Sequence, residues 1–158
     1  MSPAAPQPES PGRIAGIDFG TVRIGIAICD PSRTIASPYE NYTRRGPEQD
    51  LEHFRRLVAD EGVSLFVVGL PVHLDGRESE KSLQARRFAQ WLIAGTGVAV
   101  ELFDERFSTR GAEDALLGAG LTRRRRKKRR DMVAAQIMLA AYLESGEKGR
   151  HEPGPLDG

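Results

Sequence analysis

The first residue whose type suggests chemistry is Asp18, an acid in the middle of the apolar run RIAGIDFGTVRIG. A buried carboxylate is costly unless hydrogen bonds, a cation or a metal compensate it. If this run is a strand, Gly16 and Gly20 share the face of Asp18, and we expect them to leave room for a metal and a phosphate. The alternative is that Asp18 caps the turn at Gly20 and Thr21.

Two further acids, Asp104 and Glu105, directly follow the apolar run GVAVELF. Acids at the carboxyl end of a sheet strand lie where open α/β sheets place their sites. Successive strand residues point to opposite faces, so only one of the pair is expected to face Asp18. Ordinary turn chemistry at a strand end is the alternative.

Asp131 is the acid that a helix could bring to the same place. At helical spacing it aligns with Ala134, Ala135 and Met138, a largely small-residue face that could lie close to a sheet. The alternative is a solvent-facing acid in the first helical turn, where the helix dipole favours negative charge.

Three carboxylates from two strands and one helix could hold a pair of hard cations. Mg²⁺ takes oxygen ligands and keeps several waters, and Mn²⁺ is the alternative. Two such ions about 3.5–4 Å apart can activate water and stabilise the leaving oxygen in phosphodiester cleavage. A zinc site is not indicated, because Cys29 is the only cysteine and the three histidines lack ligand spacing.

Eight consecutive basic residues, 123–130, precede Asp131. Without them the chain has 15 basic against 22 acidic residues, so positive charge is localised on an otherwise acidic protein. Such a row could bring nucleic acid to a carboxylate cluster that would otherwise repel it. The predicted phosphate-binding residues are Arg123, Arg124, Arg125, Arg126, Lys127 and Lys128. A solvated flexible loop is the alternative.

Composition indicates one ordinary globular domain in 158 residues, with 39% hydrophobic and 28% charged residues. Residues 1–12 and 146–158 are rich in Pro, Gly and polar residues and are predicted to be disordered tails around a folded part, 13–145. No signal peptide or membrane-length apolar segment is present, so we expect a cytoplasmic protein without membrane contact.

The elements that must position the acids follow from hydrophobic periodicity. The pattern predicts three consecutive strands and then two helix–strand units, which implies an α/β fold with a mixed five-stranded sheet: a three-strand antiparallel meander, then βα units, flanked by helices. This is the element order of ribonuclease H-like folds. The predicted strands are 13–20, 23–30, 34–42, 64–70 and 97–103, and the predicted helices are 47–60, 79–93, 108–117 and 127–144.

Four motifs carry a specific resemblance. The segments GIDFGTVRIGIA, VVGLPVHLDG, DERFST and KKRRDMVAA occur in the order that is typical of the YqgF/RuvX-like family. The resemblance covers about residues 13–146 and implies a ribonuclease H-like nuclease that looks like a Holliday junction resolvase and is linked to ribosomal RNA processing. It implies Asp18, Glu105 and Asp131 as catalytic metal ligands, and so selects Glu105 over Asp104.

The function expected from this resemblance is a metal-dependent endonuclease that processes the 5′ end of the pre-16S ribosomal RNA during ribosome biogenesis. Resolution of branched DNA is the alternative within the same chemistry, and a homodimer is a possible assembly. A non-enzymatic RNA-binding module is the alternative of another class, although aromatic residues, at 6%, do not interrupt the basic row. The DFGT motif also resembles a phosphate-binding hairpin of actin-like ATPases, but the chain is too short for their two lobes.

Overall fold

The computed structural model describes residues 12–71, 79–105, 123–145 and 150–151. One mixed sheet, in the order β3-β2-β1-β4-β5-β6, forms the centre of the molecule. The strands are β1 (Arg13–Asp18), β2 (Arg23–Cys29), β3 (Ala36–Thr43), β4 (Val63–Leu70), β5 (Ala99–Asp104) and β6 (Arg150–His151), and the helices are α1 (Pro47–Glu61), α2 (Glu80–Thr96) and α4 (Arg123–Ser145).

The antiparallel half of the sheet is the predicted meander. β1 pairs with β2, and β2 pairs with β3, both antiparallel. Pro38 predicts an edge or a strand end because proline cannot donate to the ladder. β3 is indeed the edge strand, and its register shifts next to Pro38.

The parallel half consists of the two predicted βα units. β4 pairs with β1 and with β5 in parallel, so the carboxyl ends of all three strands lie at the same edge of the sheet. α1 begins at Pro47, which is favourable in the first turn because its missing N–H would have no partner there. α2 is capped by Ser79, whose hydroxyl accepts from the Ser82 amide at 3.2 Å. The predicted fold class is therefore confirmed.

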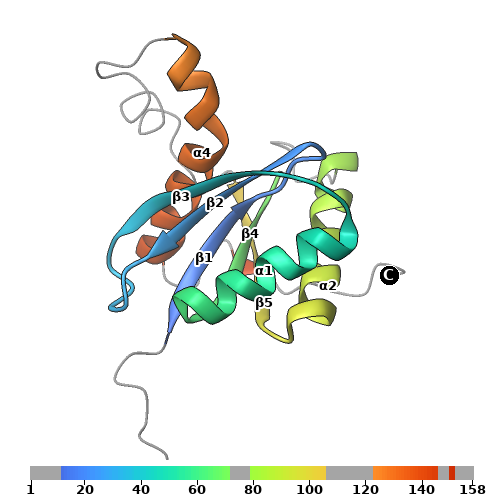
Figure 1. Cartoon of the computed structure of the whole chain (residues 1–158). Helices are drawn as coiled ribbons and strands as arrows, with labels where there is room; N and C mark the ends of the chain where they lie inside the picture. Colours follow the sequence, from blue (N-terminus) through green and yellow to red (C-terminus); the bar gives the residue numbers. More distant parts are fainter. Residues whose placement is uncertain (1–11, 72–78, 106–122, 146–149, 152–158) are drawn as a thin grey trace, which may run out of the picture.

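Helices cover both faces of the sheet. α1 and α2 lie on one face and α4 on the other (Figure 1). The core on the α1 and α2 side is aromatic, with Phe54, Phe66 and Phe88 in edge and face contacts. The core on the α4 side joins Val67 and Phe103 of the sheet to smaller helix residues such as Ala135.

Two features differ from the sequence expectation. α4 begins at Arg123, four residues before the predicted start, so the basic row is helical. β6 adds a sixth strand of two residues within the predicted C-terminal tail, and it pairs with β5. Apart from Gly12, the remaining residues of the predicted tails lie outside the described residues, and so does the predicted helix 108–117. Among the residues that the structure describes, no helix has the length and apolar character needed to cross a bilayer.

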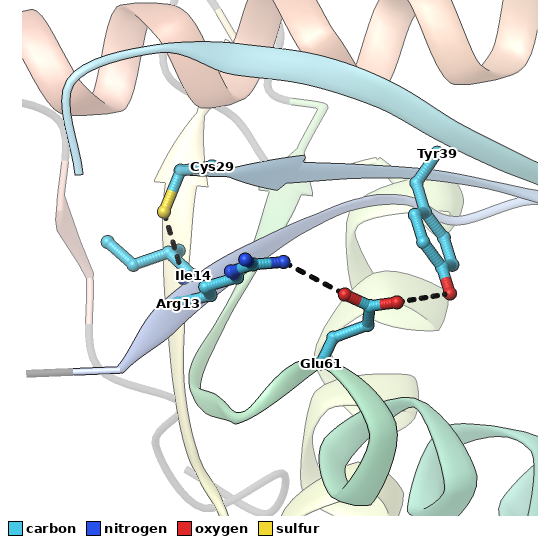
Figure 2. A network of polar contacts seen from close by, with 5 residues as sticks. All are labelled: Arg13, Ile14, Cys29, Tyr39 and Glu61. Atoms are coloured by element: carbon cyan, nitrogen blue, oxygen red, sulfur yellow. Dashed lines mark hydrogen bonds and ion pairs between the residues drawn. The ribbon is translucent and has the colours of Figure 1, made fainter. Parts of the chain in front are cut away.

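Polar contacts fix the end of the sheet where β1 begins (Figure 2). Glu61, the last residue of α1, accepts from Arg13 of β1 at 2.9 Å and from the hydroxyl of Tyr39 of β3 at 3.2 Å. The buried Cys29 thiol accepts from the Ile14 amide at 3.1 Å, which agrees with a structural role for this lone cysteine. These contacts lie at the opposite end of β1 from Asp18.

Candidate active site

Asp18 is the last residue of β1 and is half-buried. Ala15 and Ile17 belong to the core under α1 and α2, whereas Ile14 belongs to the core under α4. By strand alternation, Asp18 lies on the α4 face together with Ile14 and Gly16. Its ladder partner is Gly25 of β2.

The expected role of the two flanking glycines is wrong for Gly16, whereas Gly20 and Asp18 line a common pocket. A Cβ at Gly16 would lie 2.9 Å from the Cβ of Leu139, so that space is filled by α4 and not left for a ligand. A Cβ at Gly20 would overlap the backbone carbonyl of Arg23, so this glycine serves the tight β1–β2 turn. The glycines allow close backbone approach around Asp18, and the space for a ligand lies at the strand end, beside Gly20.

Asp104 and Glu105 lie in opposite environments. Asp104 ends β5 on the α1 and α2 side of the sheet, beside Leu102, and is only 1% exposed. Glu105 follows the strand, and its side chain extends over Gly69 of β4, where an added Cβ would lie 2.7 Å from Glu105 Oε1. As strand alternation predicts, only one of the two acids lies on the face of Asp18, and that acid is Glu105.

Gly69 is a site residue that the sequence analysis did not identify. Ile17 pairs with Val68, so Asp18 and Gly69 occupy the next position along the neighbouring strands β1 and β4. Because Gly69 has no side chain, Glu105 crosses from β5 over β4 in the direction of β1. The sequence did contain a signal, because Gly69 is the sole glycine in the buried run VSLFVVGL. A glycine inside a strand often marks a place where another group approaches the backbone closely.

A pocket of about 390 Å³ lies at the carboxyl ends of these strands. It joins four segments: the β1–β2 turn, the end of β4, the first two turns of α2 and the residue after β5. Its lining residues are Asp18, Phe19, Gly20, Thr21, Gly69, Pro71, Lys81, Gln84, Ala85 and Glu105. Two of the three predicted acids thus share one cavity, at the place where open α/β sheets bind ligands.

Asp131 does not line this pocket. Its backbone packs directly on Gly25, the ladder partner of Asp18. A Cβ added at Gly25 would overlap the Asp131 carbonyl group and would lie 2.9 Å from the Met132 nitrogen. Its carboxylate, 35% exposed, lies 3.7 Å from Nε of Arg23. Within the described ranges, no group of three His, Cys, Asp or Glu side chains is close enough to hold a metal ion. The helix face predicted for Asp131 does meet the sheet, but the three acids do not form one cluster.

The predicted nucleic-acid residues Arg123, Arg124, Arg125, Arg126, Lys127 and Lys128 form the first two turns of α4. This part of the helix rises beyond the sheet in Figure 1. A regular helix distributes consecutive residues around its axis, so only part of the row can contact one partner.

A buried acid that is linked to the pocket through Arg44 and Phe19 was not expected from the sequence. Asp50 of α1 is 1% exposed and accepts from the Tyr42 hydroxyl at 2.8 Å and the Arg45 amide at 2.9 Å. Arg44 is 3.3 Å from the same carboxylate and lies over the Phe19 ring, 5.3 Å from its centroid. The network therefore supports Phe19, the residue after Asp18. A signal was available, because Asp50 lies four residues before Phe54 on the apolar face of the predicted helix.

The hydrogen bonds of this network determine its ionisation. Burial, the largest single influence, raises the pKa of Asp50, but the hydrogen bonds led by the Arg45 amide outweigh it and hold the pKa below its usual value. Burial, followed by the hydrogen bond to Asp50, raises the pKa of Tyr42 to about 12. Asp50 is thus an ionised acceptor and Tyr42 a protonated donor over the whole neutral pH range.

The architecture defines the class of protein first. The chain has the ribonuclease H-like fold: it resembles a T. thermophilus RuvC in complex with a Holliday junction substrate, with a TM-score of 0.58 at 12% identity over 89% of this chain and 99% of that one. Residues 12–145 match the RuvX family, described as Holliday junction resolvase. The chain belongs to this family.

The names of relatives refer to ribosomal RNA and not to Holliday junctions. A protein of Rhodopirellula baltica named "Putative pre-16S rRNA nuclease" is 48% identical over 134 residues, which cover 85% of this chain and 78% of the relative. A protein of Anaplasma marginale with the same name is 41% identical over 138 residues, covering 87% of each chain. The sequence resemblance to the YqgF/RuvX-like family is confirmed.

Proposed function

We propose that this chain is a cytoplasmic, metal-dependent endonuclease that hydrolyses phosphodiester bonds of structured nucleic acid, and that its substrate is the 5′ end of the pre-16S ribosomal RNA. The observation that carries the proposal is the pocket at the carboxyl ends of β1, β4 and β5, with Asp18 and Glu105 in its lining. The names of the relatives support the choice of RNA.

The donor set fits Mg²⁺ or Mn²⁺. Asp18 and Glu105 provide carboxylate oxygens in an open pocket with space for water, which suits hard cations that keep part of their hydration. Asp131, beside Gly25, is the proposed third ligand. Its carboxylate, which pairs with Arg23 in this structure, would leave that ion pair to bind the metal. When bound, a pair of such ions supplies an activated water and stabilises the leaving oxygen.

The chain itself orients these groups. Gly69 lets Glu105 extend over β4, and Gly25 lets the α4 backbone approach the strand beside Asp18. The Arg44 and Phe19 contact, fixed by the buried Asp50, supports the β1–β2 turn. These residues hold the carboxylates in place before substrate arrives, which lowers the reorganisation that the reaction needs.

Cleavage of branched DNA is the second candidate function. It is favoured by the description of the RuvX family and by the fold shared with a RuvC that was solved with a Holliday junction. A symmetric junction presents two equivalent strands, so this activity would require a homodimer.

The proposal is tested with Asp18→Asn. The wild type is incubated with a structured RNA carrying the 5′ leader of a 16S precursor and with four-way DNA junctions, in Mg²⁺, Mn²⁺ or chelator, and the products are mapped. Asn keeps the size of Asp but loses the charge that attracts the cation, so we expect cleavage to fall about a hundredfold or more with unchanged circular dichroism.

Asp60→Asn is the matched control, because Asp60 is an exposed acid of α1 outside the pocket. It should cleave at the wild-type rate. Normal cleavage by Asp18→Asn under the same conditions would refute the metal-dependent mechanism, and nucleic-acid binding without cleavage by the wild type would favour a binding module.

A further inference from the structure

The pocket contains a second set of polar groups that the carboxylate chemistry does not use. Lys81, Gln84 and Ala85 of α2 line it together with Asp18 and Glu105. Their spacing of i, i+3 and i+4 places them on one side of the helix. The cavity is therefore acidic at the strand ends, and on α2 it has a cation and an amide.

Packing fixes the position of this part of α2. Ala85 is 1% exposed, and the next turn buries Phe88 and Ala89 in the core. Phe19, the neighbour of Asp18 in the sequence, stacks on Phe88 with ring centroids 4.7 Å apart. The β1–β2 turn and α2 are thus held together, which sets Lys81 and Gln84 at a defined place relative to Asp18.

The two side chains are available for a ligand. Lys81 is exposed and, in the part of the chain that the structure describes, has no ion-pair partner. Gln84 is half-buried at the pocket wall and carries two amide donors. An ammonium group and an amide donor suit a phosphate oxygen, and they do not suit a further cation.

The proposed reaction has an electrostatic difficulty that this arrangement would reduce. A phosphodiester is an anion, and it must approach the carboxylates of Asp18 and Glu105, which repel it. A lysine lining the same cavity offsets part of this repulsion and can also donate a charge-assisted hydrogen bond.

We propose that Lys81 and Gln84 form a phosphate subsite, which binds the backbone of the strand whose phosphodiester is presented to Asp18 and Glu105. This inference rests on the proposed nuclease function and adds a substrate-binding element to it. The subsite contacts phosphate and not bases, so it positions the strand without selecting its sequence.

The test uses Lys81→Ala, Lys81→Arg and Gln84→Ala in the full chain. Arg87→Ala is the matched control, because Arg87 is an exposed cation of the same helix that does not line the pocket. Binding of the leader RNA and of a four-way DNA junction is measured at several salt concentrations in Ca²⁺, which suppresses cleavage. Cleavage kinetics are measured separately in Mg²⁺, and thermal unfolding reports on the fold.

Lys81→Ala should weaken binding and raise KM about tenfold, as expected for a lost hydrogen bond between charged groups. It should also lower the magnitude of the log–log salt slope by about 0.9 for duplex DNA or about 0.7 for a single strand. Lys81→Arg should restore the slope. Gln84→Ala should weaken binding about threefold without changing the slope, since it removes no charge.

The outcomes separate the two proposals. If the wild type cleaves but Lys81→Ala has the affinity and slope of Arg87→Ala, the subsite is refuted and the nuclease function stands. If the wild type binds without cleaving and Lys81→Ala still lowers the slope, the nuclease function is refuted and the phosphate contact stands. Absence of binding by the wild type would refute both.

Discussion

At the scale of single residues, Asp104 and Glu105 show how one step along a strand changes the role of an acid. Asp104 is 1% exposed on the side of the sheet that packs against α1 and α2. Glu105 lies over Gly69 and lines the pocket with Asp18. Adjacent carboxylates thus lie in the buried interior at one position and at a pocket wall at the next.

This contrast predicts different losses for Glu105→Gln and Asp104→Asn. Glu105→Gln should reduce the cleavage rate about a hundredfold or more with little change in thermal stability, because the group that it alters faces the pocket. Asp104→Asn should mainly lower the melting temperature, because it changes a buried acceptor on the other side of the sheet. Single-turnover rates and thermal unfolding measured on both variants check this, and a larger loss of rate in Asp104→Asn would reverse the assignment.

At the scale of elements, glycines determine how closely the helix and the strand ends approach each other. Gly16 and Gly25 lie under α4, at Leu139 and at the backbone of Asp131 respectively. At these two positions no side chain of the strand separates the helix from β1 and β2. Asp131 reaches the neighbourhood of Asp18 because of this contact and not through the length of its own side chain.

Gly25→Ala should therefore disrupt both packing and activity. The added Cβ would overlap the backbone of Asp131, which cannot move without displacing α4. Overpacking of this kind costs about 1–3 kcal/mol, and each kcal/mol should lower the melting temperature by about 2–4 °C in a protein of this size. Cleavage measured well below the melting temperature should also fall, because Asp131 is shifted away from Asp18.

Gly95→Ala is the matched control for this prediction. Its Cβ would also overlap a neighbour, but the atoms concerned are the two methyl groups at the end of the flexible Leu51 side chain. Gly95 is within α2, where Ala is favoured over Gly by about 1 kcal/mol. We expect Gly95→Ala to be close to neutral; equal destabilisation of the two variants would contradict the account of α4 packing.

The elements themselves were more predictable from the sequence than the contacts between them. The continuous apolar run SLFVVGL, 64–70, predicted a buried strand, and the helical periodicity of Phe54 and Leu57 predicted a helix. Both elements are present as β4 and α1. The start of α4 was missed because a basic row has no apolar period, although Arg and Lys are good helix formers. The extension of Glu105 over Gly69 depends on strand order, which no local pattern specifies.

The same limit applies to the candidate site. Placing acids at strand ends, and admitting only one of an adjacent pair to each face, needed only strand geometry. Lys81 could not be included, because its link to Asp18 runs through the stacking of Phe19 on Phe88, a contact between residues far apart in the sequence. The burial of Asp50 likewise depends on the hydroxyl and amide that Tyr42 and Arg45 bring from β3 and the loop after it.

At the scale of the whole molecule, charge is distributed unevenly. The formal net charge is +1, yet eight of the 23 basic residues are consecutive, at 123–130. These residues form the start of α4, which rises beyond the sheet (Figure 1). Asp131, further along the same helix, contacts Gly25 of β2. One helix therefore joins the region of concentrated positive charge to the neighbourhood of the carboxylates, as expected for electrostatic guidance of an anionic substrate.

This view is tested by replacing four arginines with Gln: Arg123, Arg124, Arg125 and Arg126. Gln is chosen because it keeps the helix propensity while removing the charge. If about half of a helical row contacts the backbone, two contacts are lost, and the magnitude of the salt slope should fall by roughly 1.4 for a single strand to 1.8 for a duplex. Binding is measured at several salt concentrations in Ca²⁺, and the weakening should be uniform across sequences, since phosphate contacts do not read bases. Substitution of Arg55 and Arg56 of α1 by Gln is the control and should leave the slope close to that of the wild type. An unchanged slope in the α4 variant would show that the basic row is a solvated surface and that the substrate reaches the pocket by another route.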